Sequence, residues 1–504
     1  MTSQYVDVLI VGAGLSGIGA GYHLQAYCPK KSYAILEGRA RSGGTWDLFR
    51  YPGVRSDSDM FTLGYRFRPW TDAKAIADGP DILKYVRETA EHYGIDKKIR
   101  YNTRVKSASW SSQDARWTVT VTEGPDQAPQ TYTCNFLFMC SGYYNYAAGY
   151  TPEFKGRDAF AGRIIHPQKW PDDLDYAGKR VVVIGSGATA VTLVPAMAKT
   201  AAHVTMLQRS PTYVVSRPSV DVRADWLRQH LPAKAAHAAI RWRNVMWGMY
   251  IFRTAKRKPE GMKQFILNGV QQQLGPDYDV RKHFTPKYNP WDQRLCLVPD
   301  GDLFKSIKDG SSEVVTDEID TFTAAGIKLK SGAELPADII VTATGLDLIP
   351  IGGVQLIVDG KAVEPAKTLT YKGMMYSDVP NMATAFGYTN ASWTLKCDLT
   401  CEYVCRMLNH MDQHSYVQCV PRRDASVGEA PWVDFSSGYI QRAVDKVPKQ
   451  GDRMPWKLHQ NYARDLLALR FGSLKDGVLE FSGRPQVPGA RPAAAAQTSL
   501  ATPA

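Results

Sequence analysis

Two glycine-rich turns, each placed directly after an apolar segment, constrain this chain more than any other feature. The first, Gly12-Ala13-Gly14-Leu15-Ser16-Gly17, follows the apolar run 6–11 and opens a helical stretch. In such a turn the first glycine allows a tight bend, the second lets backbone approach a pyrophosphate, and the third lets the helix pack on the strand. Free N–H groups at the helix start then face the phosphates. The turn therefore predicts a dinucleotide site in an α/β fold.

The residues after each turn indicate which dinucleotide binds. A second expected strand, 33–36, ends in Glu37, where a carboxylate accepts hydrogen bonds from ribose hydroxyls. The second turn, Gly185-Ser186-Gly187-Ala188-Thr189-Ala190, follows the strand 180–184, and its third position is the alanine that the pattern allows. The next strand, 204–207, is followed by Arg209 and Ser210 rather than by an acid. Because arginine can bind a 2′-phosphate through charge-assisted hydrogen bonds, the second site is expected to hold NADPH.

Two dinucleotides in one chain indicate a flavin paired with a nicotinamide, since the flavin can accept hydride and pass electrons onward. Disulfide reductases share this plan but need a redox cysteine pair, and residues 43–57 contain none. The eight cysteines show no Cys-x-x-Cys and no metal-ligand spacing, so no metal site is expected. Cys397, Cys401 and Cys405 recur every four residues and are expected to be buried thiols. Oxygen remains as the small electron acceptor.

Composition excludes several other classes of protein. The chain is 44 % hydrophobic and 22 % charged, which is typical of a soluble, core-forming protein, and it has no apolar run long enough to span a bilayer. The N-terminal segment leaves no room for a signal peptide, so we expect a cytoplasmic protein. Between residues 221 and 263 there are ten Lys/Arg and three Asp/Glu, so +7 of the net charge of +12 lies in this segment. A surface that binds nucleic acid would spread the positive charge more widely, so this concentration argues against one.

Further motifs resemble a known family. The segment Gly44-x-Trp46-x4-Tyr51-Pro52-Gly53-x3-Asp57 is similar to one fingerprint of the type I Baeyer–Villiger monooxygenases, which are class B flavoprotein monooxygenases. The segment Phe160-x-Gly162-x3-His166-x3-Trp170-Pro171 resembles the other fingerprint, and it lies between the two glycine turns as in that family. Ala343-Thr344-Gly345-x-Asp347 is similar to the family's return strand. Other stretches, such as Tyr-Thr-Asn-Ala-Ser-Trp-Thr-Leu-Lys, resemble the mycobacterial ethionamide-activating branch.

The resemblance implies a reaction. FAD reduced by NADPH would react with O2, and the resulting C4a-peroxyflavin would insert one oxygen atom next to a ketone carbonyl, giving an ester or lactone, with sulfoxidation as a side activity. The attacking species must stay anionic, which requires a permanent cation beside it. The family's arginine maps onto Arg294, and the aspartate that orients it maps onto Asp57. Gln293 replaces a lysine that in many relatives helps to hold the 2′-phosphate.

The resemblance also implies the contacts of both cofactors. Besides the two glycine turns (Gly12, Gly14, Gly17, Gly185, Ser186, Gly187 and Ala188), the expected FAD contacts are Ser16, Glu37, Gly44, Thr45, Trp46, Asp57 and the backbone of Val105, and the expected NADP contacts are Arg55, Ser56, Thr189, Arg209 and Ser210. His166 is expected to couple domain movement rather than take a proton from substrate. Met374, Met375, Tyr388 and Trp393 are guesses at the substrate pocket.

The expected fold is two Rossmann-like dinucleotide-binding domains with a helical insert in the NADPH domain. The FAD part comprises residues 1–146 and 351–484, the NADPH part residues 172–216 and 290–350, and the insert residues 217–289, with a disordered tail at 485–504. In the insert an apolar stripe (Trp242, Val245, Met246, Met249, Tyr250) precedes Lys256-Arg257-Lys258. It is either a core face or a peripheral membrane contact through 240–258.

Two other functions stay open at this stage. One is an N/S-oxygenating flavin-containing monooxygenase, although Trp170 and Arg294 argue against it. The other is a nucleotide-binding sensor or interaction protein that has lost turnover. The sequence leaves the oligomeric state and the physiological substrate open, beyond small ketones or sulfides.

Overall fold

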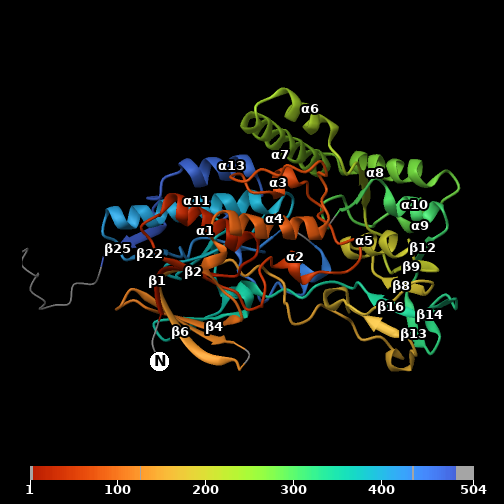
Figure 1. Ribbon diagram of the computed structural model, residues 1–504, viewed down its shortest axis with the longest axis horizontal. Coiled ribbons are helices and arrows are strands. Elements are labelled where there is room, and N and C mark those ends of the chain that lie inside the picture. The colour runs from red at the N-terminus through yellow and green to blue at the C-terminus, as the bar shows by residue number, and fades with distance from the viewer. Residues whose placement is uncertain (1–3, 125, 294, 434–435, 484–504) are drawn as a thin grey trace, which may run out of the picture.

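Two β-sheets lie at opposite ends of an elongated molecule (Figure 1). The computed structural model describes residues 4–124, 126–293, 295–433 and 436–483. The expected tail, 485–504, lies outside the described residues. The chain builds most of the first sheet, crosses to the second, and then returns to complete the first. The expected α/β class, with two Rossmann-like units and helices between them, is confirmed.

The first sheet combines a parallel half with an antiparallel half. Strand β1 (Gln4–Val11) is central, with β2 (Tyr33–Leu36) and β3 (Ile99–Arg100) parallel on one side and β6 (Ala128–Met139) parallel on the other. Antiparallel strands β5 (Arg116–Glu123) and β4 (Thr103–Ser111) follow β6. After the chain returns, β17 (Gln355–Val358), β18 (Lys361–Val363) and β21 (Met382–Thr384) join this sheet.

Strand β1 is apolar throughout its second half because both faces of the sheet are covered. Val8 and Ile10 pack into one core with the helices, whereas Leu9 and Val11 pack into the core on the opposite face. The helices on the first face are α1 (Leu15–Tyr27), α4 (Gly79–His92) and α11 (Trp393–Gln413). All eight cysteines are free and buried, including the three on α11, which confirms that prediction.

The second sheet is entirely parallel. Its order is β12 (Ser312–Thr316), β9 (His203–Gln208), β8 (Arg180–Ile184), β16 (Ile339–Thr342) and β7 (Arg163–Ile165). Helices α5 (Ala188–Met197), α9 (Val280–His283) and α10 (Asp302–Lys308) accompany it. Strand β7 pairs with β16 although it precedes residue 172, where we expected the NADPH part to begin. Three residues are too few to show strand periodicity, so the sequence did not reveal it.

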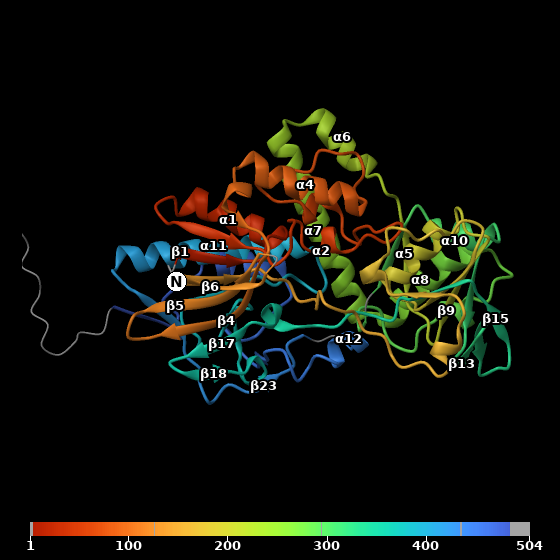
Figure 2. The same cartoon turned by 60° about the horizontal axis from the view of Figure 1, so that its bottom comes forward.

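The insert consists of α6 (Val222–His230), α7 (Ala233–Arg257) and α8 (Pro259–Leu274). Helix α6 and the adjoining end of α7 project beyond both sheets, whereas α8 packs on α10 (Figure 2). The apolar stripe of the insert is not a single core face. Val245 is buried, but Trp242, Met246 and Tyr250 are exposed, so the core interpretation fails for those three. The described chain contains no helix that is long and apolar enough to cross a bilayer.

Shorter elements complete the structure. Helices α2 (Thr45–Leu48) and α3 (Met60–Leu63) lie between the two sheets, and α13 (Tyr462–Leu466) packs on α11. The remaining elements are β10 (Val214–Arg217) with β11 (Cys296–Pro299), β13 (Ile319–Thr323), β14 (Gly326–Leu329), β15 (Glu334–Pro336), β19 (Thr370–Tyr371), β20 (Met375–Tyr376), β22 (Gln418–Pro421), β25 (Leu479–Ser482), β23 (Glu429–Ala430), β24 (Gln450–Gly451) and α12 (Gly438–Gln441).

Candidate active site

One cavity of about 1830 Å³ lies between the two sheets and is lined by both glycine turns. A pocket for a single small ligand usually measures roughly 300–1,000 Å³, so this space can hold more than one large ligand. The insert, the segment 386–393 and several other loops also contribute to its wall. The two predicted nucleotide sites therefore face a common space.

The first glycine turn has the geometry that the sequence predicts. Gly12 has a φ of +105°, and a Cβ there would lie 2.6 Å from the carbonyl oxygen of Cys140. A Cβ on Gly17 would lie only 1.9 Å from the carbonyl oxygen of Gly12. Gly14 lines the cavity and begins α1 without a side-chain cap. The first N–H groups of α1 are thus left for a ligand, as an anion site requires.

Glu37, expected to bind ribose hydroxyls, stands at the end of β2 and lines the cavity. Its carboxylate accepts hydrogen bonds from the backbone N–H groups of Ala13 (2.8 Å) and Arg39 (3.0 Å). Burial raises the pKa of the Glu37 carboxyl, against the opposing effect of those two donors. Each oxygen keeps a second acceptor position, so the group can still receive ribose hydroxyls. Val105, across the first sheet, also borders the cavity.

The second glycine turn is equally constrained at its first residue. Gly185 has a φ of +136°, and a Cβ there would lie 2.3 Å from the carbonyl oxygen of Ala343. A Cβ on Gly187 would meet nothing within 4 Å, and this glycine lines the cavity together with Ser186, Ala188, Thr189 and Ser210. The turn therefore leaves room for a phosphate to approach the start of α5.

Arg209 follows β9 and lies beside Ser210, but it is not among the residues that line the cavity. Its side chain is exposed and makes no ion pair within the described part of the chain. The guanidinium is therefore still available to a phosphate that extends beyond Ser210.

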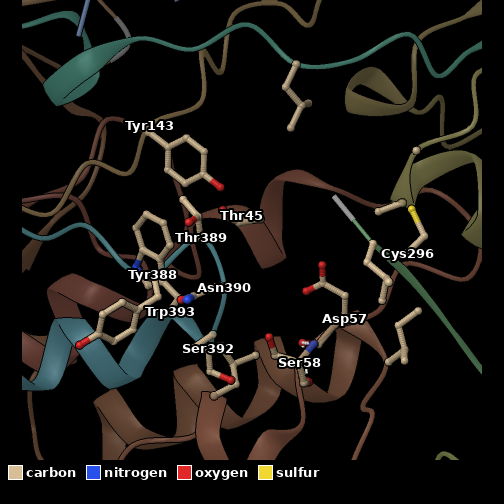
Figure 3. A pocket seen from close by; sticks show the side chains of 18 of the residues that line it. Thr45, Asp57, Ser58, Tyr143, Cys296, Tyr388, Thr389, Asn390, Ser392 and Trp393 are labelled. Carbon is tan, nitrogen blue, oxygen red and sulfur yellow. Dashed lines mark hydrogen bonds between the residues drawn. The ribbon is translucent and has the colours of Figure 1, made fainter. Parts of the chain in front are cut away.

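The start of α2 and the loop between α2 and α3 form one wall of the cavity. The residues of this segment that were expected to contact a cofactor all line it: Gly44, Thr45, Trp46, Arg55, Ser56 and Asp57. Figure 3 shows Asp57 and Ser58 on one side, with the carboxylate of Asp57 directed into the open space, and Thr389, Asn390, Ser392 and Trp393 on the other. Asp59 fixes the end of the loop by capping α3 at Thr62 and by accepting a hydrogen bond from Asn244 of α7 (2.9 Å).

Arg294 lies outside the described residues. Its neighbours Gln293 and Leu295 both line the cavity. Gln293 and Leu295 therefore border the same space as Asp57, although they are far from it in sequence.

The second fingerprint lies outside the cavity wall. Phe160 is buried, and a Cβ on Gly162 would lie 2.3 Å from the carbonyl oxygen of Asp338. His166 Nδ1 accepts from the N–H of Gln168 (3.2 Å), and Nε2 donates to the carbonyl oxygen of Gly345 (3.3 Å). Burial lowers the pKa of His166, which favours the neutral ring that these two bonds require. His166 thus joins the outgoing connection between the sheets to the returning one.

Trp170 and Pro171, which end the fingerprint, are partly buried, and Trp170 packs on the core of the second sheet. Neither residue reaches the cavity wall.

The aromatic wall opposite Asp57 was only partly predicted. Trp393 lines the cavity, stacks on Tyr143 (ring centroids 5.0 Å apart) and donates from Nε1 to Ser16 Oγ (2.9 Å). Tyr388 also lines it. Met374 and Met375, the other guesses, are fully buried in the core and do not reach the cavity.

Two charged clusters beside the cavity were missed from the sequence. The buried carboxylate of Asp47 lies between Arg39 (2.6 Å), Arg87 (2.8 Å), Arg50 (3.3 Å) and Arg41 (3.6 Å). This cluster leaves excess positive charge next to the first glycine turn, which suits a pyrophosphate. The only sequence signal was the number of arginines between residues 39 and 50.

The second cluster joins the two halves of the molecule. Arg55, expected to contact NADP, donates to both carboxylate oxygens of Asp302 on α10. The loop that carries Asp57 is thereby tied to the second sheet. No local pattern marks this pair, because its partners are 247 residues apart.

Comparisons with known proteins agree with this geometry. A family model described as flavin-binding monooxygenase-like matches residues 72–225, and one described as an NAD(P)-binding Rossmann-like domain matches residues 10–75. The chain is 57 % identical to the FAD-containing monooxygenase EthA of Mycobacterium tuberculosis, over 96 % of this chain and 99 % of that protein. It is 50 % identical to the putative FAD-containing monooxygenase MymA of the same species, over 96 % and 99 %.

Solved structures share the fold. One is an oxidised steroid monooxygenase bound to NADP, with a TM-score of 0.71, 24 % identity and coverage of 84 % of this chain and 88 % of that one. Another is the open form of a cyclohexanone monooxygenase, with a TM-score of 0.69, 21 % identity and coverage of 83 % and 90 %.

Proposed function

The chain belongs to the FAD-containing monooxygenases, and from this premise we propose that it is a Baeyer–Villiger monooxygenase. It uses FAD, NADPH and O2 and acts on small molecules. The proposed reaction inserts one oxygen atom next to a ketone carbonyl to give an ester or lactone, with oxidation of organic sulfides as a side activity.

The described residues fit both cofactors. FAD would be held by the first glycine turn, the start of α1, Glu37, Val105 and the arginines around Asp47, with Ser16, Thr45 and Trp46 along its length. NADPH would be held by Ser186–Thr189 and Ser210, with Arg209 for the 2′-phosphate. When bound, FAD supplies the redox chemistry, since it accepts hydride from NADPH and delivers electrons to O2.

The proposed catalytic pair is Asp57 and Arg294. The observation that carries the proposal is that Asp57 points into the cavity while Gln293 and Leu295, on either side of Arg294, border the same space. An arginine stays protonated at any relevant pH and can stabilise an attacking anion and the charge that develops on a carbonyl oxygen. The Asp57 carboxylate would hold that guanidinium in one orientation and balance its charge.

The surrounding residues would keep water away from the reacting atoms. The wall opposite Asp57 is formed by Trp393, Tyr143 and Tyr388, whose rings pack against one another or against the core. A dry, prearranged site strengthens the effect of a fixed cation and protects a reactive oxygen species from hydrolysis. His166 would act on the relative position of the two sheets through its bond to Gly345.

The alternative is an N/S-oxygenating flavin-containing monooxygenase. The match of residues 72–225 to the flavin-binding monooxygenase-like model favours it. That chemistry uses a protonated oxidant and a soft heteroatom, so it does not need a permanent cation beside the reacting oxygen.

Arg294 variants test the proposal. Arg294→Ala should keep FAD and be reduced by NADPH at close to the wild-type rate without oxygen, yet lose ester formation by at least about 100-fold. Arg294→Lys, which keeps a charge, should retain part of the activity, and the neighbouring Gln293→Ala is the matched control. Ester formation by Arg294→Ala at close to the wild-type rate would remove the catalytic assignment.

A further inference from the structure

Helix α7 is apolar on both sides, since it buries Ala236, Ile240 and Val245 yet also exposes large apolar side chains. Its inward face also carries Arg241, which is only 5 % exposed. Nη1 of Arg241 donates to the carbonyl oxygens of Phe61 (3.0 Å) and Gly64 (2.9 Å), and the guanidinium pairs with Asp398 (3.6 Å). Its outward side chains Trp242, Met246, Trp247 and Tyr250 are 44 %, 55 %, 55 % and 59 % exposed. A surface helix normally turns its apolar side toward the core. The outward face of α7 therefore has the composition of a contact surface.

Neighbouring helices extend this surface. Val222, Trp226 and Leu231 are exposed on or beside α6, and Phe265 on α8 is 70 % exposed. Of the fifteen large apolar side chains exposed in the described part of the chain, eight lie between residues 222 and 265. Helix α6 packs on α7, which packs on α8, and both views show α6 and α7 together beyond the two sheets (Figures 1 and 2). We name these eight side chains the insert ridge.

The segment that carries the insert ridge also carries unpaired cations, two of which, Arg253 and Arg257, line the cavity. Of the ten Lys/Arg between residues 221 and 263, six make no ion pair within the described residues: Arg223, Lys234, Arg253, Arg257, Lys258 and Lys263. Two of the three acids in this segment are already neutralised, since Asp221 pairs with Arg243 and Asp225 with Arg228. The segment thus presents tryptophan, tyrosine and methionine side chains together with unpaired positive charge.

We propose that the insert ridge docks the enzyme on an anionic lipid surface. Tryptophan and tyrosine have an apolar body and a polar edge that suit the boundary between headgroups and acyl chains, and unpaired lysines and arginines are attracted to anionic headgroups. A second copy of the chain fits less well. A two-fold contact through this face would bring the same cations together, without acids to offset them.

Docking in this orientation would place the mouth of the cavity at the lipid. Trp247 and Phe265 belong to the ridge and also line the cavity, so the cavity opens beside them. If the proposed function holds, a ketone dissolved in the bilayer could enter without crossing water. The docking itself does not depend on that function.

The test is sedimentation of the FAD-loaded enzyme with vesicles. Vesicles of phosphatidylcholine with about one third phosphatidylglycerol should bind it at least ten times more tightly than phosphatidylcholine alone, and 0.5 M salt should weaken the binding because exposed charges are then screened. Trp242→Gln, Met246→Gln and Tyr250→Gln, combined, should lower the affinity at least ten-fold. Arg223→Gln, Lys234→Gln and Lys258→Gln, combined, should remove the preference for anionic vesicles.

A matched control separates the ridge from general surface hydrophobicity. Val444 and Met454 are 40 % and 44 % exposed but lie outside the insert, so Val444→Gln with Met454→Gln should leave vesicle binding unchanged. All three combined variants should keep the thermal midpoint of the wild type, which shows that they fold.

Three results would overturn the proposal. One is equal binding of the wild type to anionic and neutral vesicles. Another is a ridge variant that still sediments with anionic vesicles like the wild type. The third is a wild-type dimer that the ridge variant converts to a monomer, which would identify a second copy as the occupant. Because none of these readouts uses ketone turnover, failure of the proposed function would leave them unchanged.

Discussion

Replacing Gly17 with alanine should disrupt the first nucleotide site where helix α1 packs on the glycine turn. The new Cβ would lie 1.9 Å from the carbonyl oxygen of Gly12, about 1.5 Å short of ordinary van der Waals contact. Gly12 cannot retreat, because its φ of +105° and the carbonyl of Cys140 behind it fix its position. Helix α1 would have to move away from the turn instead.

The expected cost follows from the contacts that this movement breaks. Overpacking a well-packed site typically costs about 1–3 kcal/mol. The movement would pull on Ala13 and so strain the hydrogen bonds from Gly43 N to Ala13 O (3.0 Å) and from Ala13 N to Glu37 (2.8 Å), each worth about 1 kcal/mol. Gly17→Ala should therefore destabilise the apoprotein by about 3–5 kcal/mol.

Matched substitutions in the second turn provide the controls. Ala190 occupies the position equivalent to Gly17 and is fully buried, so Ala190→Gly should cost only about 1 kcal/mol. Gly187→Ala should leave the apoprotein within about 0.5 kcal/mol of the wild type, because its Cβ meets no atom within 4 Å. Its methyl group would instead enter the cavity and weaken NADPH binding.

Urea unfolding of the apoproteins, followed by tryptophan fluorescence, measures these differences, and titration with FAD measures the affinity. Gly17→Ala should have a clearly lower midpoint and at least 100-fold weaker FAD binding. A Gly17→Ala apoprotein as stable as the wild type would refute the argument that α1 packs directly on the turn.

Three further substitutions test other parts of the site. Arg209→Ala should raise the KM for NADPH far more than the KM for NADH, and equal effects in steady-state assays would remove its 2′-phosphate role. Asp302→Asn should destabilise the protein by about 1–3 kcal/mol and weaken NADPH binding; the loss is smaller than for a fully buried ion pair because Asp302 is partly exposed. An unchanged urea midpoint and NADPH affinity would contradict the role of its pair with Arg55. Burial, together with the nearby Arg241, lowers the pKa of His237 to about 4. Between about pH 6.5 and pH 4, the unfolded chain therefore binds a proton at His237 that the folded chain does not bind. Stability should fall as the pH falls through that range, and a His237→Gln variant with the same pH dependence as the wild type would contradict this.

Local patterns predicted the parts of the site that local geometry determines. The strands 33–36 and 180–184 have the predicted bounds, Gly17 is required by its contact with the Gly12 carbonyl oxygen in the same turn, and Gly12 and Gly185 have the positive φ of a tight turn. These requirements arise within a few consecutive residues, so a local sequence pattern can show them. A strand was expected only over residues 136–140, and the start of β6 at Ala128 was missed because residues 128–131 form no apolar run and pair only with β5.

Contacts between distant segments were not predictable in the same way. Nothing around Arg55 or Asp302 marks them as partners, and the burial of Arg241 depends on carbonyl groups of α3 that precede it by nearly 180 residues. The buried side of α7 contains Ile240 and Val245 as well as Arg241, so apolar residues lie on both sides of this helix. Helical spacing alone therefore could not show which apolar residues of the stripe are buried.

The proposed oxidation of ketones through Asp57 and Arg294 can be tested by product analysis of the purified enzyme with FAD, NADPH and ¹⁸O2, offered 2-octanone, phenylacetone and thioanisole together. Esters that carry one ¹⁸O atom should form alongside the sulfoxide, coupled to NADPH consumption. Sulfoxide without any ester, still coupled to NADPH, would contradict this proposal and assign the enzyme to the heteroatom oxygenases.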